Sequence, residues 1–552
     1  MKSSMEGPVG LKRIRYGFFF SWFCLCLYAC KEDRPFILSI EPRIGLSGEI
    51  LTIEGSGFGT EQHESYITIA GIPPTGSSYL SWQDDRVTVK IPALGGFGLV
   101  YVHRDGKKSN PLLFSNRAAM PDLVQNQVLG LAPQISSIKP ESGSIGALIS
   151  IQGSGFGASR EKRGVFFTWN AEPSPTAPEV TQEPEVVEVF EMEFGYELWS
   201  DREIRLRVPD GAVSGNILVR TPWGSSKPVF FTVTDRPGTK TFKEKHSYTL
   251  AYTVDIQVQE AAAPNTLYLW IPHPVSSASQ RNVTLLSRNR EPFAEHYQGT
   301  TLFQLTDLAA NTRVRLSLSY LVDVYTLETT LKTQAIRQTG DSPIPTVYTL
   351  PSGLIPSDNP EVVAAANAII GKERNPYEKA RKLYEWLIHE GGIQGTPLHT
   401  TGIPDALVQK QGDAYSGALL FCALARAVAI PAIPVAGVLI NRARTSSPHY
   451  WAEFWIAGFG WIPVDPCLGA GMAPEDFPLH EEPAAYYFGN LDNQRITFSR
   501  GQEVLSQMDP RGRITVRNRD YALQNLWEEA IGGIESYSSL WSDITITGMY
   551  IQ

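Results

Sequence analysis

The segment His449-Tyr-Trp-Ala-Glu-Phe-Trp-Ile-Ala-Gly-Phe-Gly-Trp-Ile-Pro-Val-Asp-Pro466 carries the most informative pattern in this 552-residue chain. Two runs rich in aromatic and β-branched residues flank Gly458-Phe-Gly460, which is typical of a turn between antiparallel strands. Successive side chains of a strand point to opposite faces, so His449 and Trp451 share one face. The segment therefore predicts a hairpin with His449 on its first strand and Asp465 at the end of its second.

Three helices are predicted upstream of this hairpin. Asn359-Pro360 and Asn375-Pro376 each place a capping side chain before a proline at the first helical position. The second helix has apolar residues at helical spacing, which are Ala380, Leu383, Tyr384, Leu387 and Ile388. The third predicted helix follows Gly412-Asp413 and is apolar nearly all round until Arg426. We expect it to be the buried central helix of its domain.

Residues 405–468 resemble the core of the transglutaminase-like superfamily, whose enzymes use papain-like thiol chemistry. The resemblance covers about 357–501, and the strands expected at 245–331 look like the β domain that often precedes such cores. It implies an α+β fold in which a cysteine at a helix N-terminus attacks an amide carbonyl, a histidine relays the proton and an aspartate orients that histidine. By this resemblance, His449 and Asp465 take the histidine and aspartate positions.

The chain departs from the family at the nucleophile. The cysteine belongs directly after Gly412-Asp413, where this sequence has Ala414. A methyl group cannot attack a carbonyl or form a thioester, and loss of a triad nucleophile costs on the order of 10⁶ in rate. We therefore expect a pseudoenzyme with a binding or structural role.

Three other side chains are candidates to replace the missing thiol. Ser416 lies about 200° round the helix from position 414, so it is expected to point away. Cys422 lies about 12 Å along the helix among core residues. Cys467 comes two residues after Asp465 and supports the alternative of an active acyltransferase or amide hydrolase with a non-standard nucleophile. Its thiol would approach the imidazole from the wrong side. Without any nucleophile, His449 is either a binding residue or a structural one.

An internal repeat with an offset of 98 residues occupies the N-terminal part of the chain. Gly55-Ser-Gly-Phe-Gly59 returns as Gly153-Ser-Gly-Phe-Gly157, and 153 − 55 = 98. Short alternating strands surround both copies, glycine permits a sharp turn at positive φ, and the phenylalanine would anchor that turn. A phosphate loop is disfavoured because no Lys-Ser/Thr and no helical pattern follow. The copies, at 36–116 and 134–235, resemble IPT/TIG domains, which implies immunoglobulin-like sandwiches and says little about function. We expect them to act as spacer or adhesive modules.

Residues 1–30 predict a lipoprotein signal peptide. Basic residues precede an uncharged, largely apolar run at 16–29, and this run is shorter than the roughly 20 residues of a spanning helix. Ala29-Cys30, followed by charged residues, resembles the bacterial lipobox and implies lipidation of Cys30. The alternative is an ordinary cleaved signal. We expect an exported protein, lipid-anchored at a bacterial membrane of the cell envelope, periplasm or surface.

Composition narrows the remaining function classes. The net charge is −9 and no dense basic block occurs, which disfavours nucleic-acid binding. Three of the five cysteines lie in the first 30 residues, so a disulfide framework and a CxxC zinc site are excluded. No HExxH motif occurs, and we expect no metal and no cofactor. The expected partner is a protein, peptide or peptidoglycan ligand at the cell envelope.

The sequence thus predicts a multidomain chain with two all-β sandwiches, a further β domain and an α+β core. The last segment, 502–552, is a C-terminal extension to which no chemistry is assigned. Within it, the pattern suggests a helix at 520–531 and a strand at 543–548.

Overall fold

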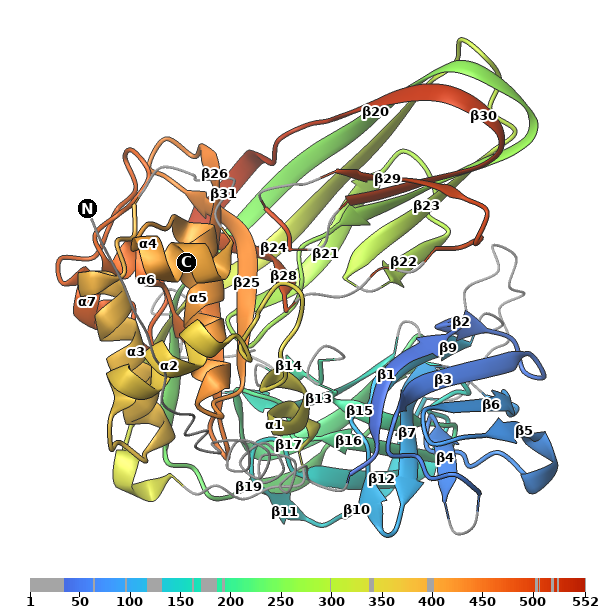
Figure 1. Cartoon of the computed structure of the whole chain (residues 1–552), viewed down its shortest axis with the longest axis horizontal. Helices are drawn as coiled ribbons and strands as arrows, with labels where there is room; N and C mark the ends of the chain where they lie inside the picture. Colours follow the sequence, from blue (N-terminus) through green and yellow to red (C-terminus); the bar gives the residue numbers. More distant parts are fainter. Residues whose placement is uncertain are drawn as a thin grey trace, which may run out of the picture.

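The structure is a computed structural model that describes residues 34–551, with gaps at 63–64, 95–96, 117–131, 161–162, 170–185, 191–193, 298, 337–341, 395–401, 502–504, 506, 518–520 and 524–525. The predicted signal peptide and Cys30 lie outside the described residues. The chain is mostly β and multidomain, as predicted. Figure 1 shows two sandwiches in blue and cyan, long green and red strands above them, and a helical layer in gold and orange.

The first sandwich consists of two sheets, in the orders β1-β3-β6-β5 and β2-β9-β7-β4, with β8 paired to β7. Its strands are β1 (Phe36–Glu41), β2 (Ile44–Gly45), β3 (Ile50–Ser56), β4 (Tyr66–Ile69), β5 (Tyr79–Trp82), β6 (Arg86–Lys90), β7 (Phe97–Arg104), β8 (Lys107–Lys108) and β9 (Leu112–Asn116).

The second sandwich repeats this arrangement, with sheets in the orders β10-β12-β16-β15 and β11-β19-β17-β13-β14, and β18 paired to β17. Its strands are β10 (Gln134–Lys139), β11 (Ser142–Gly143), β12 (Leu148–Ser154), β13 (Gly164–Trp169), β14 (Val186–Glu188), β15 (Tyr196–Trp199), β16 (Glu203–Arg207), β17 (Ala212–Thr221), β18 (Gly224–Ser225) and β19 (Val229–Val233).

The repeated glycine motif acts as the sequence predicts. A Cβ on Gly55 would lie 1.9 Å from the carbonyl oxygen of Phe36, so the neighbouring strand excludes any side chain there. Gly57 has a φ of +75°, and Phe58 is fully buried. Phe156 is fully buried at the corresponding place in the second copy. The motif is therefore a turn that is anchored in each sandwich core.

The third unit is one sheet in the order β21-β24-β20-β23-β22, extended by β29, β30 and β31. Its dominant strand, β20, is 35 residues long and pairs with β23, β24, β30 and β31. Strands β29, β30 and β31 lie within the predicted extension 502–552, and they complete the sheet that contains β20. The strands are β20 (Gly238–Pro272), β21 (Gln280–Arg288), β22 (Ala294–Tyr297), β23 (Thr300–Thr306), β24 (Arg313–Leu331), β29 (Arg513–Arg517), β30 (Leu526–Trp541) and β31 (Thr545–Ile551).

The helix predicted at 520–531 is wrong, because β30 begins at Leu526 and occupies the second half of this segment. Glu528 and Glu529 favour a helix locally, but both are fully buried in the sheet. Glu528 accepts a hydrogen bond from Trp541 Nε1 at 2.9 Å, and Glu529 accepts one from the Met508 N–H at 2.7 Å. Such long-range partners override local propensity. The strand predicted at 543–548 is confirmed by β31.

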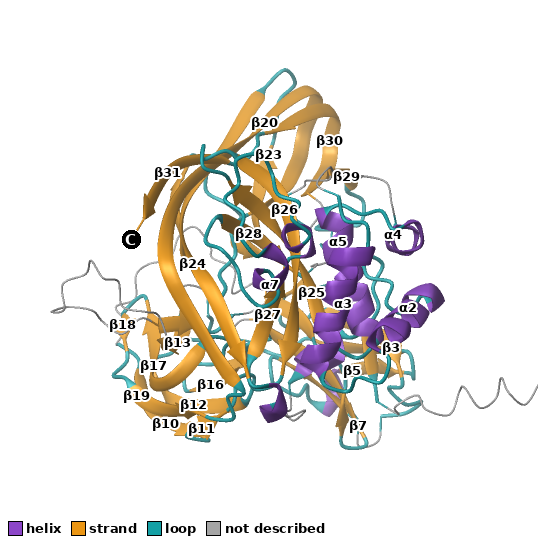
Figure 2. Cartoon of the chain, turned by 90° about the vertical axis from the view of Figure 1, so that its left-hand side faces the viewer, coloured by secondary structure: helices purple, strands orange, loops and turns teal. Residues whose placement is uncertain are grey.

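The core contains a sheet in the order β27-β26-β25-β28 and seven helices within the described residues. The strands are β25 (Ala432–Ile440), β26 (Ser446–Ile456), β27 (Gly460–Val464) and β28 (Arg495–Arg500). The helices are α1 (Pro343–Tyr348), α2 (Pro360–Ile370), α3 (Pro376–Glu390), α4 (Ile403–Gln409), α5 (Ala414–Ala427), α6 (Pro466–Gly469) and α7 (Pro483–Tyr486). Helices α2, α3 and α5 lie together on one side of the sheet (Figure 2).

The three helices predicted upstream of the hairpin are confirmed. Asn359 and Asn375 cap α2 and α3 by accepting hydrogen bonds from backbone N–H groups of the first turn. Helix α5 is buried along its length from Ser416 to Arg426, as its all-round apolar pattern predicts.

Candidate functional site

The structure brings His449 and Asp465 together on the β26–β27 hairpin. The hairpin register pairs Ala452 with Val464, which places the two residues near the open end of the hairpin. His449 Nε2 lies 2.8 Å from Asp465 Oδ2. Asp465 is fully buried, and His449 is only 3% exposed. The geometry is that of a carboxylate that fixes the orientation and tautomer of an imidazole.

An arginine binds the same carboxylate. Arg495 on β28 donates from Nη1 to Asp465 Oδ2 at 3.1 Å, and the Leu468 N–H donates to the other oxygen at 3.0 Å. Arg495 also bonds Asp492 at 2.6 Å. Burial raises the pKa of Asp465, but the charges and hydrogen bonds of His449 and Arg495 outweigh it, so the pKa lies below its ordinary value. Asp465 is therefore ionised at neutral pH.

The orientation of the imidazole leaves its second nitrogen on the far edge of the ring. Because Nε2 faces Asp465, Nδ1 is the atom available to another group, and it makes no hydrogen bond to any residue that the structure describes. The ring stacks against Trp451, with 6.3 Å between centroids. The Arg495 guanidinium lies over the same indole at 4.8 Å. Trp451 therefore packs beside both side-chain partners of Asp465.

Ala414, which the resemblance predicts to take the nucleophile position, is the first residue of α5. Asp413 caps this helix by accepting from the Ser416 N–H at 2.9 Å, and the Ser416 hydroxyl accepts from the Asp413 N–H at 2.7 Å. Tyr415 packs edge-on against Tyr450, with 4.9 Å between ring centroids. The neighbours of Ala414 and His449 are thus in contact. Ser416 is fully engaged in the cap and cannot serve as a substitute nucleophile.

Neither described cysteine has the surroundings of a reactive thiol. Cys422 is fully buried in the helical core, and this burial raises its pKa to about 12. Cys467 donates from Sγ to the Met472 carbonyl at 3.3 Å. Burial, followed by the charges of Asp465 and Asp413, raises the pKa of Cys467 far above its usual range. An activated cysteine needs the opposite environment, with cationic groups or an open helix N-terminus beside it.

Sequence reasoning missed two buried arginines around this site and the carboxylates that they bind. Arg495 joins Asp465 to Asp492, and Arg500 donates to Glu453 at 2.6 Å on the same hairpin. The three-residue spacing of Asp492 and Arg495 is visible in the sequence, but nothing in it pairs Arg495 with a residue 30 positions earlier.

No group of three His, Cys, Asp or Glu side chains suited to a metal ion occurs in the described part of the chain.

Comparison with known families identifies the same units. Residues 363–466 match the family model of the transglutaminase-like superfamily, and residues 35–115 and 133–243 match that of the IPT/TIG domain. The chain therefore contains a transglutaminase-like core and IPT/TIG domains, as predicted.

Two curated relatives match parts of the chain. An uncharacterized protein of Haemophilus influenzae is 28% identical over 168 residues, which are 24% of this chain and 45% of that protein. A cyclomaltodextrin glucanotransferase of Bacillus licheniformis is 30% identical over 114 residues, 20% of this chain and 16% of the enzyme. The chain thus spans less than half the length of either relative.

Two solved structures show weaker likeness. A proposed cysteine protease from Cytophaga hutchinsonii covers 57% of this chain and 92% of its own, at 19% identity and a TM-score of 0.35. A surface glycan-binding protein from Prevotella bryantii covers 54% of this chain and 99% of its own, at 8% identity and a TM-score of 0.14.

Proposed function

We propose that this chain, which combines a transglutaminase-like core with two IPT/TIG domains, is an exported, lipid-anchored surface protein whose core binds a partner without cutting or joining it. The observation that carries the proposal is Ala414 at the first position of α5. His449 and Asp465 form a hydrogen-bonded pair. Ala414 has only a methyl side chain, so it has no proton that the imidazole could accept.

The proposed partner is a protein, a peptide or the peptide part of peptidoglycan at the cell envelope. The support is chemical, since an imidazole with an engaged Nε2 still offers Nδ1 to a polar group of a guest. The site lies on strands and a helix of the core, which hold its side chains rigidly. No nucleic acid fits the proposal, because the net charge is −9.

The proposal predicts no thiol-dependent turnover in the wild-type chain. The purified protein is assayed for amine incorporation into a glutamine peptide and for release of ammonia or amine from amide substrates. Rates are expected to equal those of buffer, with Cys467→Ser indistinguishable from wild type, because the pKa of Cys467 is raised by burial and by Asp465. Turnover in the wild type that Cys467→Ser abolishes would instead establish the alternative, an acyltransferase or amide hydrolase that uses Cys467.

Membrane attachment gives a separate prediction. No helix in the described part of the chain has the length and apolarity to span a bilayer. If lipidation of Cys30 is the anchor, Cys30→Ser is expected to move the protein from the membrane fraction to the soluble exported fraction. Cys26→Ser is the matched control, since it removes a thiol from the neighbouring apolar run at 16–29 and leaves Cys30 in place. Equal partitioning of Cys30→Ser and wild type would exclude the lipid anchor.

A further inference from the structure

The turn end of the β26–β27 hairpin is held by residues from two other units. The Trp461 N–H donates to Asp210 Oδ2 at 3.1 Å, and Lys240 Nζ donates to the Trp461 carbonyl at 2.6 Å. Lys240 also binds both oxygens of Asp210, at 2.5 and 2.7 Å. Asp210 belongs to the second sandwich and Lys240 to β20. Three units of the chain therefore meet at one residue of β27, through its backbone donor and acceptor together.

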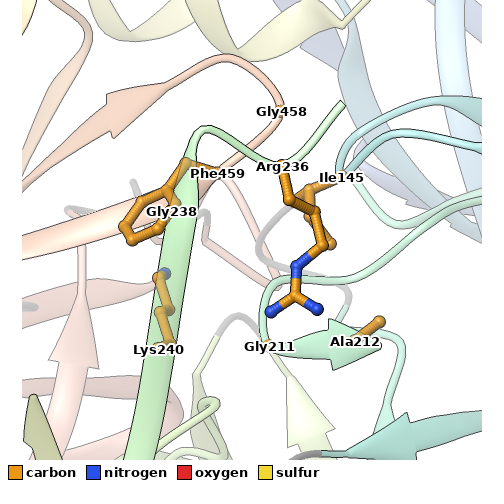
Figure 3. A pocket seen from close by; sticks show the side chains of 8 residues that line it. All are labelled: Ile145, Gly211, Ala212, Arg236, Gly238, Lys240, Gly458 and Phe459. Carbon is orange, nitrogen blue, oxygen red and sulfur yellow. The ribbon is translucent and has the colours of Figure 1, made fainter. Parts of the chain in front are cut away.

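Asp210, Lys240 and the backbone of Trp461, called the clamp below, are buried and closely packed. Asp210 and Lys240 are 4% and 5% exposed. Gly460 has a φ of +99°, and a Cβ at this position would lie 2.1 Å from Asp210 Oδ1, so glycine is required for the carboxylate to reach the strand. Lys240 lies beside Phe459, and both residues line the small pocket that Figure 3 shows.

The second sandwich also contacts the turn and the first strand of the hairpin. Ile145 forms a β-bridge with Gly458 in the turn. A Cβ on Gly146 would lie 3.1 Å from the Trp455 indole, which shows how closely the sandwich approaches β26. Trp455 and Trp461 are both buried in a hydrophobic cluster that extends through the second sandwich. The turn of the hairpin is thus embedded in that sandwich.

The other end of the same hairpin carries the candidate site. Asp465 follows β27 directly, about 13 Å from Trp461 at the rise of a strand. A slip of one residue in strand register moves every side chain to the opposite face. Such a slip of β27 would separate Asp465 from His449. We infer that Asp210 and Lys240 are positioning residues for the His449–Asp465 pair, and that the second sandwich is part of the construction of this site.

This inference goes beyond the proposed function, since it holds whether the core binds or reacts. It also departs from the expectation that the second IPT/TIG domain is a spacer or adhesive module. The clamp stabilises the position of β27, so a change in the second sandwich that shifts this strand is expected to alter the hydrogen bond of the His449 imidazole. A module that served only as a spacer would leave the imidazole unaffected.

The test follows the Nε2 proton of His449 by NMR in the full chain with ¹⁵N-labelled histidine, assigned with His449→Gln. Asp210→Asn is expected to broaden or remove this resonance, or to speed its exchange with solvent on the order of tenfold or more. Ser226→Ala is the control. Ser226 is similarly buried in the same sandwich, and its hydroxyl bonds the Val219 N–H and the Lys227 carbonyl, both of that sandwich. This variant is expected to leave the His449 resonance unchanged.

A double variant guards against simple unfolding. Asp210→Asn with Lys240→Met leaves no buried charge unpaired, so it is expected to fold. Loss of the His449 resonance in a double variant with wild-type circular dichroism supports the positioning role. An unchanged resonance in that variant overturns it, and so does an equal loss in Ser226→Ala. The readout needs no ligand and no turnover, so its failure is distinct from a failure of the proposed function.

Discussion

Replacing Ala414 with cysteine is expected to create a thiol that iodoacetamide labels at neutral pH. The new thiol would stand at the N-terminus of α5, a 14-residue helix whose dipole favours a thiolate there. We expect labelling roughly tenfold faster than that of a cysteine with an unperturbed pKa. In the wild type, Cys422 and Cys467 are expected to stay unmodified, because burial raises the pKa of both. Peptide mass measurement assigns each adduct to its residue.

Two controls separate the causes of this reactivity. Ala427→Cys places a thiol at the opposite end of the same helix, where the dipole disfavours a thiolate, so slow labelling is expected. Ala414→Cys combined with His449→Gln removes the imidazole and is expected to lose part of the rate enhancement. If Ala414→Cys reacted no faster than Ala427→Cys, position 414 would not be an inherited nucleophile position. The pseudoenzyme proposal would then lose its basis.

Local signals in the sequence were enough to predict the elements that carry the site. The Asn-Pro pairs at 359–360 and 375–376 specify their own caps, and Gly458-Phe-Gly460 specifies its turn, because each involves partners a few residues away. The glycine motifs of the two sandwiches were predictable for the same reason. Resemblance then added which residues of these elements belong to one site.

The features that sequence reasoning missed depend on partners far apart in the chain. Lys240 reaches the carbonyl of Trp461, 221 residues away, and Arg495 reaches Asp465, 30 residues away. Glu528 and Glu529 are typical of a surface helix when only the sequence around them is considered, and their hydrogen-bond partners lie outside that stretch. A buried charge cannot be distinguished from an exposed one by its neighbours in sequence, so these pairs required the fold itself.

These buried pairs also connect the stability of the chain to its site. Asp465 bonds His449 and Arg495, and Arg495 also bonds Asp492. The strand that precedes Asp465 is held by the clamp at Trp461. Asp465 and Asp210 are each buried and paired with a cation inside the protein, which makes removal of one partner costly. The His449–Asp465 pair therefore has a structural role that mutation can test, whether or not the core reacts with a substrate.

Asp465→Ala is expected to lower the free energy of unfolding by about 3–5 kcal/mol, because it leaves the Arg495 guanidinium and the His449 imidazole buried with one partner fewer. Urea denaturation monitored by tryptophan fluorescence gives the loss. Asp492→Ala is the matched control, since Asp492 bonds the same guanidinium but its side chain is 15% exposed, and a loss of about 1 kcal/mol is expected.

The pH dependence of stability provides a second measurement on the same carboxylate. Its folded-state pKa lies below the ordinary value of 3.8, so ionised Asp465 stabilises the fold above about pH 4, and this contribution is lost as the pH falls through the folded pKa. The stability advantage of wild type over Asp465→Asn is therefore expected to shrink steadily below pH 4. A constant advantage down to pH 2, or equal losses in Asp465→Ala and Asp492→Ala, would show that ionised Asp465 does not hold the site together.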